Sequence, residues 1–175
     1  MPIDDSREFI PVRIAVLTVS DTRGLAEDRS GDILVERLTR AGHELADRAI
    51  ERDDLDALVE RLARWVEDPQ VDVVITTGGT GVTGRDVTPE AVEAVAEKII
   101  PGFGELFRWL SFQNIGTSTI QSRATAGVAG GTYIFALPGS TGAVKDGWDG
   151  ILQYQLDSRW MPCNFVELMP RLKER

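Results

Sequence analysis

The chain has 175 residues, of which 42% are hydrophobic and 27% charged, a composition typical of a globular domain with a substantial core. Its net charge of -9 argues against a nucleic-acid surface, and no apolar run approaches the roughly 18–20 residues of a membrane helix. One cysteine and one histidine exclude an internal disulfide and a Cys/His zinc cluster, and they disfavour a histidine-activated nucleophile. The N-terminal segment does not resemble a secretory signal, so we expect a cytoplasmic protein whose chemistry depends on carboxylates, hydroxyls, backbone amides and a few cations.

Strand-like and helix-like segments alternate along the chain. After a polar arm at 1–11, the continuous β-branched apolar run at 13–19 predicts a strand buried on both faces. The first half of the chain continues with a helix at about 30–41, a candidate strand at 44–50, a helix capped by Asp53 or Asp54 and a strand at 71–77. The second half contains helices at 88–100 and 102–112, a strand at 132–137 and a helix at 141–152. This order predicts a single α/β domain at 12–168, a three-layer α/β/α sandwich with a mainly parallel sheet, and a tail at 169–175.

Three polar or glycine-rich loops follow predicted strands, at 20–24, 78–86 and 138–142. Ligands of parallel α/β folds bind beyond the carboxyl ends of the strands. We therefore expect these loops to converge on one rim of the sheet.

The loop at 78–86, within TTGGTGVTGRD, carries the strongest signal. Its glycines let the backbone approach a ligand closely and direct consecutive N–H groups at an anion. It contains a formal GxGxxG, but the next helix begins late, at Thr88-Pro89, and the acidic residue of a dinucleotide site is missing. Arg85-Asp86 stands where a Walker loop needs Lys followed by Ser or Thr. We predict a phosphate-binding loop of neither type, with a plain strand-to-helix turn as the alternative.

Several charged residues near these loops have two interpretations. Asp86 and Asp53 either cap helices or stand beside bound phosphates, where a metal ion would make a carboxylate favourable. Arg123 either grips a phosphate bidentately or pairs with a carboxylate, and Lys145 is either solvated or a phosphate contact. Ser20-Asp21 could be only a turn.

Aromatic residues at 103–112 fall near helical spacing, which indicates core or subunit packing. Phe107, Trp109 and Phe112, together with Trp160-Met161-Pro162, offer more apolar surface than a small acidic domain readily hides. We therefore predict a homo-oligomer.

The segment TTGGTGVTGRDVTPEA, with the upstream SDTR and Asp28, Ser30 and Gly31, resembles the molybdenum cofactor biosynthesis proteins of the MoaB/Mog fold. The later segments FRWLSFQNIGTSTIQSRATAGV, YIFALPGSTGA and QLDSRWMPCNFVEL resemble the protein B branch, and the likeness covers residues 10–168. The resemblance implies a molybdopterin-binding fold that forms homo-oligomers, with the hexamer of the B branch favoured over a trimer. Molybdopterin and ATP are the implied ligands, and other pathway proteins are possible partners.

The resemblance also implies an activity and a site. Active members of the family transfer AMP from ATP to the terminal phosphate of molybdopterin with Mg²⁺, and the RDVTPEA segment has the form of the active branch. Asp86 and Asp53 match the catalytic aspartates and would be the metal ligands. The matching substrate-binding residues are Ser20, Asp21, Gly78, Gly79, Thr80, Gly81, Ser122, Arg123, Pro138, Gly139 and Ser140. A phosphate nucleophile is ionised at pH 7 and needs no general base, which suits a chain with one histidine. A non-catalytic molybdopterin-binding or scaffold protein of the same pathway stays open as the alternative.

Overall fold

A computed structural model describes residues 3–22 and 24–174. Within them, six strands form one sheet in the order β2-β1-β3-β6-β5-β4. The strands are β1 (Arg13–Val19), β2 (Glu44–Glu51), β3 (Val73–Thr77), β4 (Lys98–Ile99), β5 (Thr125–Ala129) and β6 (Thr132–Leu137). The first four in this order run parallel, whereas β5 is antiparallel to β6 and β4 is antiparallel to β5.

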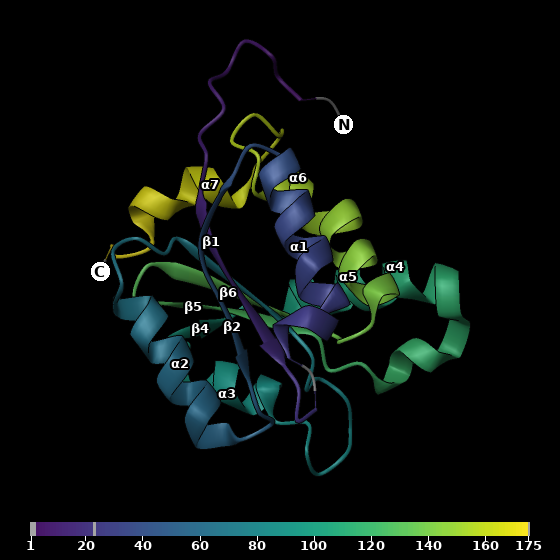
Figure 1. Cartoon of the computed structure of the whole chain (residues 1–175). Helices are drawn as coiled ribbons and strands as arrows, with labels where there is room; N and C mark the ends of the chain where they lie inside the picture. The colour runs from purple at the N-terminus through teal and green to yellow at the C-terminus, as the bar shows by residue number, and fades with distance from the viewer. Residues whose placement is uncertain (1–2, 23, 175) are drawn as a thin grey trace.

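Helices cover both faces of the sheet (Figure 1). The α-helices are α1 (Arg29–Arg40), α2 (Leu55–Glu67), α3 (Thr88–Val95), α4 (Pro101–Ile115), α5 (Thr141–Gly147), α6 (Gln153–Gln155) and α7 (Phe165–Leu168). Three short 3₁₀ helices are also described: η1 (Leu25–Glu27), η2 (Gly116–Gln121) and η4 (Met169–Arg171). The segment η3 (Trp148–Leu152) is a short π-helix. No helix in the described part of the chain is long and apolar enough to cross a membrane.

Alternation along β1 builds two cores. Ile14 and Val16 face α1, α4 and α5, while Ala15 and Leu17 face α2 and α3. Because successive side chains of a strand point to opposite faces, a strand buried on both sides is mostly apolar. The predicted three-layer α/β architecture is confirmed.

The structure corrects the element predictions at the antiparallel end of the sheet. The helix predicted at 88–100 ends at Val95, and Lys98–Ile99 pairs with β5 instead. Strand β5 was not predicted; its small residues fit closely against neighbours, since a Cβ on Gly127 would lie 2.7 Å from Ala96 Cβ. Gly130 and Gly131, both with positive φ, connect β5 to β6 in a tight hairpin.

Candidate functional site

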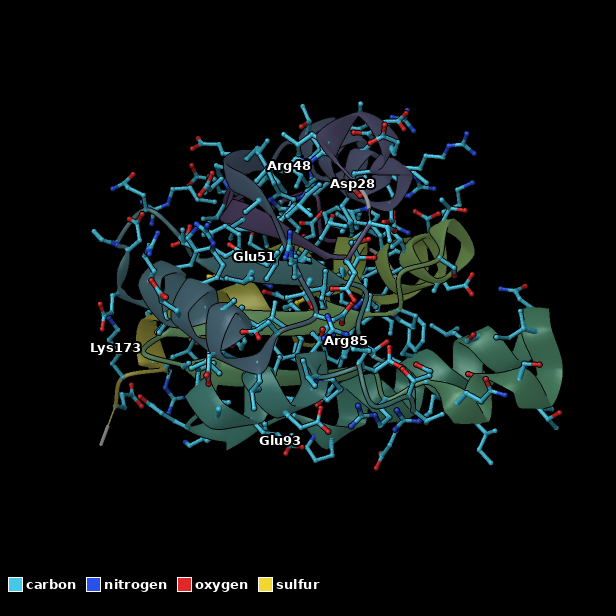
Figure 2. All side chains as sticks on the ribbon, turned by 60° about the horizontal axis from the view of Figure 1, so that its bottom comes forward. Asp28, Arg48, Glu51, Arg85, Glu93 and Lys173 are labelled. Carbon is cyan, nitrogen blue, oxygen red and sulfur yellow. The ribbon has the colours of Figure 1, made fainter. Side chains whose placement is uncertain are left out.

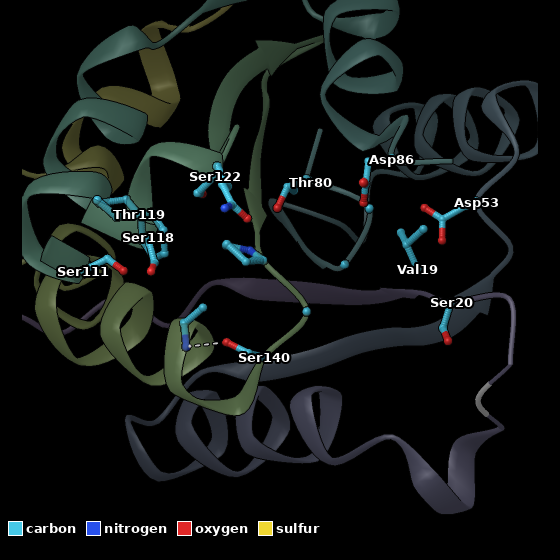
Figure 3. A pocket seen from close by; sticks show the side chains of 18 of the residues that line it. Val19, Ser20, Asp53, Thr80, Asp86, Ser111, Ser118, Thr119, Ser122 and Ser140 are labelled. Carbon is cyan, nitrogen blue, oxygen red and sulfur yellow. Dashed lines mark hydrogen bonds between the residues drawn. The ribbon is translucent and has the colours of Figure 1, made fainter. Parts of the chain in front are cut away.

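A cleft of about 570 Å³ lies beyond the carboxyl ends of β1, β3 and β6 (Figure 3). The loops expected to converge do so here, because these strands are parallel neighbours. The substrate-binding and catalytic residues inferred above all line the cleft except Arg123: Ser20, Asp21, Asp53, Gly78, Gly79, Thr80, Gly81, Asp86, Ser122, Pro138, Gly139 and Ser140. Arg23, the last residue of the SDTR motif, lies outside the described residues.

The floor of the cleft is made of backbone. Gly78 and Gly79 have φ values of +107° and +63°, a region that favours glycine. A Cβ on Gly78 would lie 2.2 Å from the carbonyl oxygen of Val19, and one on Gly139 would lie 3.2 Å from Gly78 Cα. Gly78 therefore has no room for a side chain and Gly139 has little, so the strand ends approach one another closely.

Asp53 borders this floor from the end of β2. Its Oδ1 atom is buried and accepts no hydrogen bond within the described residues. A Cβ on Gly79 would lie 2.5 Å from that atom, so only glycine leaves space beside the carboxylate. Burial raises the pKa of Asp53, the charges of Asp21 and Asp86 add to the rise, and Arg85 opposes it. A buried, unpartnered carboxylate oxygen is the kind of group that a bound cation satisfies.

Asp86 closes a turn rather than capping a helix. Its Oδ2 accepts hydrogen bonds from the Thr83 N–H at 2.9 Å and from Thr83 Oγ1 at 2.7 Å. Residue Val87 is the N-cap of α3, which has no side-chain cap. Burial acts to raise the pKa of Asp86, but the hydrogen bonds from Thr83 and the Gly81 N–H outweigh it, so the pKa is lowered. Asp86 therefore stays ionised beside the glycine-rich loop.

Three cations near the cleft, among the described residues, are paired with other groups or lie outside the lining. Arg85 forms an ion pair with Asp21. Lys145 is exposed on α5 and does not line the cleft. Arg123 donates through Nε and Nη2 to the carbonyl oxygens of Gly81 and Asp86, each at 2.6 Å, and through Nη1 to Glu90. In this structure Arg123 thus binds the loop and a carboxylate instead of facing the cleft.

One wall of the cleft was missed by reasoning from motifs. It comes from α4 and η2, opposite Asp53 and Asp86 (Figure 3), and consists of Phe107, Ser111, Ile115, Ser118, Thr119 and Gln121. The only signal in the sequence was the absence of charge between Trp109 and Ser122. Hydroxyl and amide groups interrupted by apolar side chains suit a neutral, ring-containing part of a ligand.

Asp28, quoted above only as part of a motif, is completely buried at the start of α1. It accepts hydrogen bonds from the Gly31 N–H at 2.9 Å and from Thr18 Oγ1 at 2.8 Å, and it pairs with Arg48 (Figure 2). Burial acts to raise the pKa of Asp28, but the bonds from Arg48, Gly31 and Thr18 outweigh it and lower the pKa. Asp28 therefore anchors the loop after β1 to α1 and does not line the cleft.

The described residues contain no cluster of three or more His, Cys, Asp or Glu side chains that could hold a metal ion. Asp53 and Asp86 are two carboxylates on one cleft, and Mg²⁺ is typically held by one or two carboxylates together with substrate phosphates. The unpartnered Oδ1 of Asp53 fits such a site.

The fold and the cleft define the class: an α/β/α protein with a glycine-rich loop and two aspartates at the carboxyl edge of a parallel sheet. The family model "Probable molybdopterin binding domain" matches residues 15–158. The chain therefore belongs to the molybdopterin-binding family of molybdenum cofactor biosynthesis proteins.

Individual relatives and solved structures agree with this assignment. The chain is 49% identical over 169 residues to molybdenum cofactor biosynthesis protein B of Escherichia coli K12, covering 97% of this chain and 98% of that one. A crystal structure of a molybdenum cofactor biosynthesis protein B superposes with a TM-score of 0.86 at 37% identity, covering 97% of this chain and 100% of the other. The tungsten cofactor synthesizing protein MoaB from Pyrococcus furiosus gives 0.78 at 34% identity, covering 94% and 98%.

Proposed function

We propose that this protein is a molybdopterin adenylyltransferase that uses Mg²⁺ and ATP. The observation that carries the proposal is the buried, unpartnered Oδ1 of Asp53 beside Gly79, on a cleft that also contains Asp86. A metal ion between phosphates and these carboxylates would give that oxygen a partner. A site that binds only neutral ligands would not explain why Oδ1 of Asp53 is buried without a partner.

The reaction needs no proton acceptor from the protein. A terminal phosphate oxygen of molybdopterin forms a bond to the α-phosphorus of ATP, and the bond from that phosphorus to the α,β-bridging oxygen breaks. Pyrophosphate leaves with the electron pair of the broken bond. The one histidine fits this scheme, because burial lowers the pKa of His43 to about 4 and the residue packs between Phe9 and Trp148, away from the cleft.

The residues of the chain would position and neutralise the reactants. The N–H groups of Gly79 and Thr80, which donate no hydrogen bond within the described residues, would bind phosphate oxygens, and Asp53 and Asp86 would hold the metal ion. When bound, Mg²⁺ supplies positive charge against the phosphates and aligns them for an in-line displacement. The uncharged wall of α4 and η2 would accommodate the rings of a substrate.

A non-catalytic molybdopterin-binding or scaffold protein is the second candidate. It is favoured by one observation: the hydrogen bonds from Thr83 already give Asp86 a structural role in its turn. In that case the cleft would bind the pterin and its phosphate without activating ATP.

Formation of adenylyl-molybdopterin by the purified protein separates the two. The Asp86→Asn variant retains an oxygen that can accept from Thr83 but loses the charge. We expect it to be slower by about 10²–10⁴-fold with a nearly unchanged melting temperature, because a metal-bound carboxylate stabilises the transition state. Asp54→Asn is the matched control, since Asp54 caps α2 through the Ala57 N–H and does not line the cleft. Transfer by Asp86→Asn at the wild-type rate refutes the catalytic role, and an inactive wild type that binds molybdopterin supports the second candidate.

A further inference from the structure

The carbonyl oxygens of four consecutive residues, 78–81, all accept hydrogen bonds from only two residues. Thr88 donates through Oγ1 to Gly78 at 2.9 Å and through its N–H to Gly79 at 3.0 Å. Arg123 donates through its N–H to Thr80 at 2.8 Å and through Nε to Gly81 at 2.6 Å. Neither Thr88 nor Arg123 lines the cleft, so both bind the loop from the side away from the cleft.

These bonds determine which way the loop amides point. In a trans peptide the N–H of one residue points opposite to the carbonyl group of the residue before it. With the carbonyls of Gly78 and Gly79 held by Thr88, the N–H groups of Gly79 and Thr80 point away from Thr88. Neither N–H donates a hydrogen bond within the described part of the chain, and both residues line the cleft. The next amide, that of Gly81, contributes a hydrogen bond to the carboxylate of Asp86.

We infer that Thr88 and Arg123 are positioning residues that fix the polarity of the glycine-rich loop. Thr88 directs the N–H groups of Gly79 and Thr80 toward a phosphate, and Arg123 keeps the carbonyl oxygens of Thr80 and Gly81 turned away from it. The inference rests on the proposed binding of phosphate by this loop. Glycines with positive φ can adopt several peptide orientations, and a flipped peptide would direct a carbonyl oxygen at the anion. A loop that binds an anion through its N–H groups binds it more strongly when these dipoles are already oriented before the ligand arrives.

The surroundings of both residues suit this role. Thr88 is buried at the first residue of α3, where its hydroxyl is held in place. All three nitrogens of the Arg123 guanidinium are engaged, with Gly81, Asp86 and Glu90. Arg123 therefore acts on the phosphate through the loop and not as a direct ligand.

Matched pairs of variants test the inference. Thr88→Val removes the hydroxyl with little change of shape, and Thr88→Ser restores it. Arg123→Lys keeps a charge but cannot bridge two carbonyl groups with a planar fork. Glu90→Gln removes the ion pair and leaves the bonds to the loop intact. Arg37→Met removes an ion pair with Asp149 that lies outside the cleft, and so controls for the loss of an arginine pair.

The first measurement is the binding of ATP with Mg²⁺ and of inorganic pyrophosphate by calorimetry. We expect Thr88→Val and Arg123→Lys to bind both about 10-fold to 100-fold more weakly, as loss of one or two oriented hydrogen bonds would produce. Thr88→Ser, Glu90→Gln and Arg37→Met should bind as the wild type does. Tighter binding by Glu90→Gln would overturn the inference, because a freed Arg123 would then be contacting phosphate directly. Unchanged binding by both Thr88→Val and Arg123→Lys would overturn it as well.

The second measurement is hydrogen exchange at the amides of Thr88 and Arg123 in the free protein. Their hydrogen bonds to the loop should open more often in Thr88→Val and Arg123→Lys, so exchange should be about tenfold faster. Weaker ATP binding without faster exchange would contradict a positioning role.

These readouts separate the inference from the proposed enzyme activity. A wild type that forms no adenylyl-molybdopterin, with Thr88→Val still binding ATP weakly and exchanging quickly, refutes the activity and supports the positioning role. An active wild type whose Thr88→Val and Arg123→Lys variants match it refutes the positioning role alone. A wild type that binds neither ATP nor pyrophosphate refutes both.

Discussion

Arg85 and Asp21 form a bidentate ion pair that joins two loops 64 residues apart in the sequence. Arg85 Nη2 lies 2.7 Å from Asp21 Oδ1, and Nε lies 3.1 Å from Oδ2. Asp21 Oδ1 also accepts from the Asp53 N–H at 3.3 Å. The pair therefore links the glycine-rich loop, the loop after β1 and the segment that carries Asp53, and Figure 2 shows Arg85 at this end of the sheet.

Replacing Arg85 should affect the ligand more than the fold. The pair is exposed, and exposed ion pairs contribute little stability, so Arg85→Gln should melt near the wild-type temperature. It should raise the pKa of Asp53 further, since Arg85 opposes the effects of burial and of Asp21 and Asp86. It should also bind ATP about tenfold more weakly, because Asp21, which lines the cleft, would lose the positive charge that neutralises it. Carboxyl NMR titration and calorimetry check both effects. Arg64→Gln, which breaks an exposed pair on α2, should change neither quantity.

Asp53 should destabilise the protein at neutral pH. Its native pKa is raised above the ordinary value of 3.8, chiefly by burial, so the native state binds this proton more tightly than the unfolded state does. The contribution of Asp53 to the free energy of unfolding therefore falls as the pH rises from 3.8 through the raised native pKa. We expect Asp53→Asn to be more stable than the wild type at pH 7, with the advantage shrinking as the pH falls toward 3.8, while adenylyl transfer drops about 10²-fold or more. Urea unfolding across this pH range measures the stability difference, and a constant difference would contradict the assignment.

Two glycines of the same loop should respond differently to valine. A Cβ on Gly81 would lie 2.7 Å from Asp86 Oδ2, whereas a Cβ on Gly84 would meet nothing within 4 Å. Gly81→Val should therefore displace Asp86 and weaken ATP binding by about tenfold or more, while Gly84→Val should leave it unchanged. If both variants fold and bind ATP with equal affinity, Gly81 is not part of the binding site.

The outer surface of α4 and η2 should be an interface between copies of the chain. Leu106, Trp109, Phe112 and Ile120 are exposed there. Of the residues behind the predicted homo-oligomer, Phe107 proves to be buried and contributes no free apolar surface. Trp160 is half-buried against Tyr154, whereas Met161 and Pro162 are exposed. We expect an oligomer at micromolar concentration, with the hexamer favoured over the trimer by resemblance to the B branch.

Light scattering on Trp109→Glu tests this surface. A charge at the centre of an apolar interface should shift the assembly to smaller species. Leu25→Glu, on the exposed η1 turn, should leave the assembly unchanged. A monomeric wild type would show the prediction to be wrong.

The parallel half of the sheet was predictable because burial imposes its pattern on the sequence. The runs at 13–19 and 132–137 are mostly apolar without alternation, as strands buried on both faces require. The polar loops that follow them mark the carboxyl ends of the strands, where ligands of this fold class bind. Strand β5 could not be predicted in the same way. Ala126, Gly127 and Ala129 have weak strand propensity, and pairing with β6 and β4 makes the segment a strand.

The part played by Arg123 was not predictable either. Its partner Gly81 lies 42 residues away in the sequence, and no local pattern distinguishes an arginine that binds carbonyl groups from one that binds a phosphate. The same holds for Asp53, since the missing partner of Oδ1 is a property of the packed structure alone.

The backbone contact between Gly78 and Gly139 restricts how this cleft can diversify. A side chain on Gly139 would press on Gly78 Cα, and one on Gly78 would collide with the carbonyl oxygen of Val19, so we expect substitutions there to distort the cleft and not to change its specificity. The α4–η2 wall carries side chains that can be exchanged, among them Ser111, Ile115 and Gln121. An engineer who wishes this scaffold to accept a different heterocycle should randomise that wall and keep the glycines fixed.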